Sequence, residues 1–172
     1  HPYVKIHNKF REIFGGANLL LISVEVKGGT IFNKKTLSII KNISEELVKI
    51  PGVDRYKILS IAQRKVKDLK VTDWGIETTA IMYPHLPKND AEMEKLKRSI
   101  YTNDLIYGSL VSMDSKAALI LSDFFEEDVD YQYLFNTLQE IRNKCEDKNT
   151  TISIVGNPVL LGIVRGLVGE VV

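Results

Sequence analysis

Cysteine, histidine and tryptophan are scarce in this chain. Its 172 residues include one cysteine, three histidines and one tryptophan. The single cysteine, Cys145, excludes an intrachain disulfide, and a chain of this length can bury a sufficient core without one. The histidines, at positions 1, 7 and 85, lack the spacing of a metal site. We therefore expect neither a metal nor a cofactor.

An excess of either charge is also missing. Lys plus Arg number 23 and Asp plus Glu number 22, which leaves a net charge of +1. Such a balance does not favour a polyanionic partner. The strand-like segments LLLISV, ILSI, AALILS and ISIV also lack the aromatic residues on which RNA bases stack. Nucleic acid is therefore not an expected partner.

Long hydrophobic runs are absent as well. The longest uncharged run, 149–164, is 16 residues long and is interrupted by glycine and proline, whereas a membrane-spanning helix needs roughly 18 or more apolar residues. The chain begins His1-Pro2-Tyr3, without an initiator Met or a signal peptide. It ends in the apolar segment 158–172. We expect a soluble segment of a longer protein.

Catalytic patterns are lacking too, so we do not expect an enzyme. Cys145 falls on the apolar stripe of an expected helix, which favours a small core residue over a nucleophile paired with His7 or His85. An acidic run follows one expected strand but lacks the glycine and ligand spacing of a calcium loop. A solvated helix N-terminus explains it better. The run consists of Asp123, Glu126, Glu127, Asp128 and Asp130.

The elements that are present alternate between strand and helix. Apolar periodicity predicts a helix over 3–14, a central strand over 20–26, a helix over 34–50 capped by Asn33, and a strand over 53–61. This βαβ unit favours a parallel pair with a right-handed crossover. An irregular insertion follows over 62–90, with one short strand at 76–82. The rest is expected to form a helix capped by Asp90, a hairpin of 108–112 and 117–124, a helix opened by Asp130, and a strand over 151–155.

Two βαβ halves predict an α+β fold of the ferredoxin-like type, with helices on one face of an antiparallel sheet and an insertion between the halves. The expected parts are a lead-in helix over 1–16, a first βαβ subdomain over 17–61, an insertion with a short helix over 62–107, a hairpin with the second half over 108–157, and a tail over 158–172.

Several segments, in order, carry a family resemblance. Phe14-Gly15-Gly16-Ala17-Asn18 leads into LLLISVEV, and Ile31-Phe32-Asn33 precedes a helix that ends Leu47-Val48-Lys49-Ile50-Pro51-Gly52-Val53. Later come LVSMDSKAALI, residues 110–120, and Val155-Gly156-Asn157-Pro158-Val159. Over roughly residues 14–162, this set resembles the first extracytoplasmic loop of an RND-superfamily exporter of the MMPL or Patched-like type.

The resemblance implies a porter domain in the periplasm, carried by an inner-membrane protein. Such a domain takes part in the binding and passage of hydrophobic or lipid-like substrates, driven by protons through residues outside this chain. Its partners would be the membrane helices and second periplasmic loop of the same transporter, and a further periplasmic protein. Residues 1–16 and 158–172 would then connect to membrane helices.

Insertion 62–90 is the least family-like region, so substrate or partner contacts are expected there. Its apolar residues either make such contacts or cover a sheet edge and a satellite core. They are Trp74, Ile76, Ile81, Met82, Tyr83 and Leu86.

Two other functions remain open. One is a free-standing ferredoxin-like sensor module that binds a small ligand or a protein and dimerises through a sheet edge. The other is an acylphosphatase-like enzyme, which needs an arginine beside an anion-binding loop. Arg11 precedes Gly15-Gly16, but the residues between them suit a helix better than such a loop.

Overall fold

Strand β1 (Leu20–Val26) lies at the centre of a three-stranded sheet with the order β4–β1–β5. The computed structural model describes residues 18–125 and 129–169, and the expected helix over 3–14 lies outside them. Strands β4 (Ala117–Ser122) and β5 (Thr150–Gly156) both pair antiparallel with β1. The chain therefore has a mixed α+β fold, with the strand over 20–26 central as its two apolar faces predicted.

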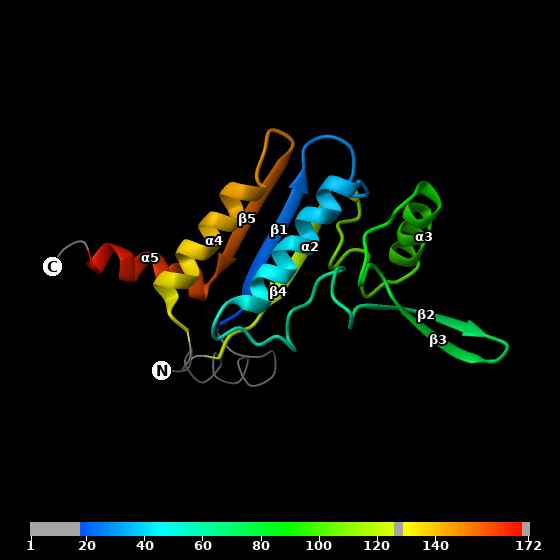
Figure 1. Ribbon diagram of the computed structural model, residues 1–172, viewed down its shortest axis with the longest axis horizontal. Helices are drawn as coiled ribbons and strands as arrows, with labels where there is room; N and C mark the ends of the chain where they lie inside the picture. The colour runs from blue at the N-terminus through cyan, green and yellow to red at the C-terminus, as the bar shows by residue number, and fades with distance from the viewer. Residues whose placement is uncertain (1–17, 126–128, 170–172) are drawn as a thin grey trace, which may run out of the picture.

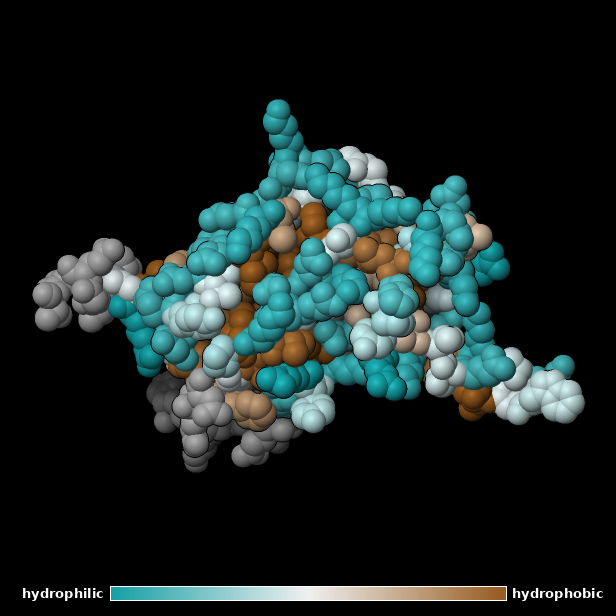
Figure 2. Space-filling model, viewed as in Figure 1, coloured by the Kyte–Doolittle hydropathy of each residue, from teal (hydrophilic) through white to brown (hydrophobic). Residues whose placement is uncertain are grey.

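Helices α2 (Lys34–Lys49) and α4 (Tyr131–Cys145) cover one face of this sheet (Figure 1). The sheet presents alternate residues to them, and the middle of that face is Ile22 of β1 with Ile120 and Ile154 beside it in register. The outer surfaces of the two helices are largely hydrophilic (Figure 2). Burial of the apolar stripes therefore holds both helices on the sheet.

Helices α2 and α4 begin where the sequence indicates an N-cap. The Asn33 side chain accepts a hydrogen bond from Thr36 N at 2.9 Å, and the Asp130 side chain does so from the amides of Gln132 and Tyr133. Helix α3 (Asp90–Tyr101) is capped by Asn89 rather than by Asp90. Asn89 accepts a bond from Glu92 N, which places the cap one residue earlier than expected.

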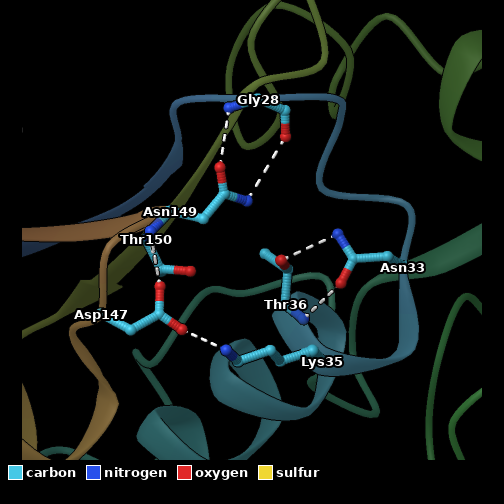
Figure 3. A network of polar contacts seen from close by, with 7 residues as sticks. All are labelled: Gly28, Asn33, Lys35, Thr36, Asp147, Asn149 and Thr150. Carbon is cyan, nitrogen blue, oxygen red and sulfur yellow. Dashed lines mark hydrogen bonds and ion pairs between the residues drawn. The ribbon is translucent and has the colours of Figure 1, made fainter.

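A polar clamp fastens the start of α2 to the turn between α4 and β5 (Figure 3). Asp147 accepts hydrogen bonds from the amides of Asn149 and Thr150 and pairs with Lys35. Mainly because Lys35 donates to it, the pKa of Asp147 is lowered to about 2. The Asn149 side chain also bonds both the amide and the carbonyl of Gly28. Since the folded-state pKa is depressed, this stabilisation is present above the ordinary aspartate pKa and is lost as the pH falls toward 2.

The expected strand over 53–61 and its expected parallel pairing with the central strand were both wrong. The expected strand over 53–61 makes only isolated bridges to the outer edge of β4, at Val53 and Leu59. Asp54 interrupts it, because its side chain and its carbonyl accept bonds from Tyr56 N and Lys57 N and turn the chain. The expected parallel pair is absent from the described sheet, since β4 lies between this segment and β1.

The hairpin expected over 108–124 is only partly correct. Its second strand is β4, but its first strand is reduced to an isolated bridge between Val111 and Ala118. Residues 106–110 instead form turns, in which Leu110 N donates to the Ile106 carbonyl at 2.8 Å. These turns place Ile106 and Leu110 in the core.

Insertion 62–90 contains two strands rather than one. Strand β2 (Lys67–Thr72) pairs antiparallel with β3 (Gly75–Ala80) in a hairpin that stands clear of the body (Figures 1 and 2). Its base is held by Asp68, which is buried and accepts a bond of 2.7 Å from Ser99 Oγ of α3. The hairpin is thus anchored at one end and exposed at the other.

Helix α5 (Asn157–Gly169) follows β5 with no intervening loop and packs on α4. The contact is close at Gly162, where an added Cβ would lie 2.6 Å from both the Tyr131 carbonyl oxygen and Phe135 Cβ. On the other side of α5, leucine and branched aliphatic side chains are exposed. They are Leu160, Leu161, Ile163 and Val164.

Candidate binding groove

The residues expected to contact a substrate or partner fall into two groups. Trp74 at the hairpin end is 97% exposed, Ile76 of β3 is 72% exposed, and Tyr83 is about half exposed. Met82 is buried, while Ile81 and Leu86 are partly buried and pack against the core. The second group therefore packs into the hydrophobic core, and only the first group is available for contact.

An apolar groove of about 630 Å³ lies on the sheet face opposite α2 and α4. Its wall on the sheet consists of Leu119 and Leu121 of β4, with Leu59 directly across from Leu121. The other walls come from the base of the β2–β3 hairpin and from the turns after α3. The groove is lined by Leu59, Lys65, Val66, Lys67, Leu69, Asn103, Leu105, Ile106, Ser109, Leu110, Leu119 and Leu121.

Backbone pairing fixes the sheet wall of the groove. Leu59 and Leu121 exchange two hydrogen bonds of 2.9 Å each, so their side chains stand side by side on the same face. Leu119 lies on that face too, because alternate residues of a strand share a face. The side chain of Asn103 accepts a bond from Leu105 N, which sets the turn that carries the mostly exposed Leu105.

The ionisable groups among the described lining residues are both lysines. Lys65 donates to the Tyr56 carbonyl, and burial lowers the pKa of its ammonium group. Lys67 is exposed at the base of β2. An apolar cavity with cations at its rim suits the apolar chain of an amphiphile whose head group is anionic or polar.

Sequence reasoning did not identify this groove. Alternation in β4 places Leu119 and Leu121 on the face away from the helices, and an apolar second face was a usable signal that a ligand or another element covers it. The remaining walls come from segments that only tertiary pairing brings together, namely Leu59, the hairpin base and the turns of 103–110.

Metal binding and catalysis by Cys145 are less well supported within residues 18–125 and 129–169. No three His, Cys, Asp or Glu side chains in these ranges converge to hold a metal ion. Burial raises the pKa of Cys145, which is half-buried rather than a full core residue. Its thiol is therefore not activated as a nucleophile.

Asp123 of the acidic run accepts a bond of 2.7 Å from Lys57, and Glu126, Glu127 and Asp128 lie outside the described residues.

Among the described residues, none of the helices has both the length and the apolar character needed to cross a membrane.

We compared the chain with models of known protein families and with curated protein sequences, and neither comparison returned a match.

Proposed function

We propose that this chain is the periplasmic porter domain of a proton-driven RND-type exporter. In this role it takes part in the binding and passage of hydrophobic or lipid-like substrates. The observation that carries the proposal is the apolar groove with lysines at its rim, lined by Leu59, Leu119 and Leu121 on the sheet face that α2 and α4 leave open. A porter domain needs such a surface for an apolar cargo.

The topology supports a ferredoxin-like porter subdomain. With Val53 and Leu59 as a fragmentary edge strand, the order across the sheet is 53–59, β4, β1, β5. The two helices lie on one face, and every neighbouring pair is antiparallel. This is the order that two interlocked βαβ halves produce, in which the parallel strands of the first half are separated by a strand of the second.

The proposal also accounts for α5. Its exposed aliphatic side chains, Leu160, Leu161, Ile163 and Val164, would pack against the rest of the transporter. The other partners would be the second periplasmic loop of the same protein and a further periplasmic protein that contacts Trp74 and Ile76.

The location of the native protein tests the proposal directly. An antibody against this chain is applied to fractionated native cells, with and without protease added to spheroplasts. We expect a large band in the membrane fraction that is cleaved from the periplasmic side. A soluble band near the 19.5 kDa of the chain itself would contradict the exporter and leave the sensor module as the function to pursue.

Binding of an amphiphile tests the groove. We expect dansyl-labelled undecanoic acid to bind the purified chain with a rise in fluorescence, and Leu105→Asp to weaken that binding about tenfold or more. Leu105 is 82% exposed on the groove wall, so the change leaves the core intact. It removes apolar contact and places a carboxylate beside the probe's own, a loss above about 1.4 kcal/mol.

Leu160→Asp is the matched control, because it makes the same change on α5, away from the groove. It should bind the probe as the unmodified chain does. Equal weakening by both variants, or no binding by the unmodified chain, would contradict a groove that accepts amphiphiles.

A further inference from the structure

The end of the β2–β3 hairpin is an exposed apolar surface of a kind that isolated domains seldom present. Trp74 is almost fully exposed, and Ile76 of β3 and Leu69 of β2 are 72% and 63% exposed. Leu69 and Ile76 lie on the same face of the ribbon, since Leu69 pairs with Thr78 and Ile76 with Val71. Large exposed aromatic residues are the common anchors of protein interfaces.

The hairpin end cannot occupy the groove of its own chain. Leu69, near the hairpin base, lines that groove. From Leu69 the strand runs on to Thr72, about 10 Å along the ribbon at the usual rise per residue, before the turn that carries Trp74. The end therefore stands beyond the groove, and any groove that receives Trp74 belongs to another molecule.

The two surfaces are complementary in charge as well as in apolar character. The ionisable groups among the described residues that line the groove are Lys65 and Lys67. Asp73, which precedes Trp74 in the turn, is exposed, whereas Glu77 lies on the face opposite to Ile76, across from Lys70. An end that carried Trp74 into such a groove would bring the Asp73 carboxylate to the lysines at its rim.

We propose that two copies of this chain associate reciprocally, the hairpin end of each lying in the apolar groove of the other. Trp74 of one copy then packs against the leucines of its partner's groove and closes the mouth of that groove. The contact is isologous, as a two-fold dimer requires. Each aromatic residue buries about 150–250 Å², and two hairpin ends with two groove walls can exceed the roughly 1,000 Å² of a stable interface.

A membrane surface is less well matched to the hairpin end. The hairpin end carries Lys70 together with Asp73 and Glu77, so it has no net positive charge to attract anionic lipid. The dimer goes beyond the proposed function but uses the same groove. A monomeric Trp74→Ala chain that binds no amphiphile would remove the proposed function alone, and an unmodified chain that binds amphiphile but stays monomeric would remove the dimer alone.

Sedimentation equilibrium of the 172-residue chain, across a wide range of concentration, tests the dimer. We expect a monomer–dimer equilibrium that Trp74→Ala shifts toward the monomer, with the dimer Kd raised about thirtyfold or more, as for loss of an aromatic anchor. Because Trp74 is 97% exposed, its removal leaves the monomer fold unchanged. Tyr133→Ala on α4, also an exposed aromatic residue, should leave the Kd unchanged.

A charge exchange tests which surfaces meet. Lys67→Glu should weaken the dimer, and adding Asp73→Lys in the same chain should restore it. The restoration can come only from the other copy, because Asp73 lies past the end of β2, about 17 Å along the ribbon from Lys67 of its own chain.

Three results would overturn the proposal. They are a monomer at every concentration, a dimer that Trp74→Ala leaves intact, and a monomer that uses Trp74 to bind phosphatidylglycerol vesicles.

Discussion

Replacing Ile22 by alanine is expected to destabilise the chain by about 3 kcal/mol, within the usual range for a large aliphatic residue that leaves a cavity in a core. Ile22 is fully buried at the middle of the central strand. Ile120 of β4 and Ile154 of β5 flank it in register. The paired strands and the helices that surround Ile22 have little freedom to move into the cavity that its removal leaves. Urea unfolding, followed by circular dichroism, measures the loss.

The neighbouring residue provides the control. Ser23 lies on the opposite face of β1, where it is only half-buried, so Ser23→Ala should change stability by no more than about 0.5 kcal/mol. A loss below about 1 kcal/mol for Ile22→Ala, or equal losses for the two variants, would contradict a core centred between this sheet face and its helices.

Apolar alternation and helix capping were sufficient to predict an element where the tertiary contacts of the segment favour the same structure. The alternation of β1 and the caps at Asn33 and Asp130 identified their elements because burial and backbone capping both act within a few residues. The termination of α2 at Pro51-Gly52 is equally local, since Gly52 adopts a φ of 82°.

The same rules failed in the β2–β3 hairpin, where a charged residue is buried and apolar residues are exposed. Asp68 is buried because Ser99 donates to it, while Leu69 and Ile76 face outward. Apolar alternation therefore indicates the wrong inner face, and a buried carboxylate whose partner comes from α3 leaves no trace in the local sequence. The groove was missed for a related reason, since pairing of Leu59 with Leu121 joins segments far apart in the chain.

Gly156 is the position where a single methyl group is expected to be most disruptive, at about 3 kcal/mol or more for Gly156→Ala. Its φ of 147° is a backbone conformation that other residues rarely adopt. An added Cβ would lie 2.3 Å from the carbonyl oxygen of Leu19 and 3.1 Å from Leu20 Cα. Both are backbone atoms of the paired central strand, so no side-chain rotation relieves the overlap.

Gly29→Ala is a control for this loss. Gly29 also has a positive φ, 79°, but an added Cβ there would meet no atom within 4 Å. Its replacement should cost only the backbone strain, about 1–2 kcal/mol. The excess loss at Gly156 then measures the contact with the Leu19–Leu20 backbone together with the greater strain of a φ of 147°, and hydrogen exchange should locate it in the β1–β5 ladder. Because α5 begins at the next residue, displacement of Gly156 should also loosen α5 from α4. Equal losses for the two variants would show that β5 does not approach β1 this closely.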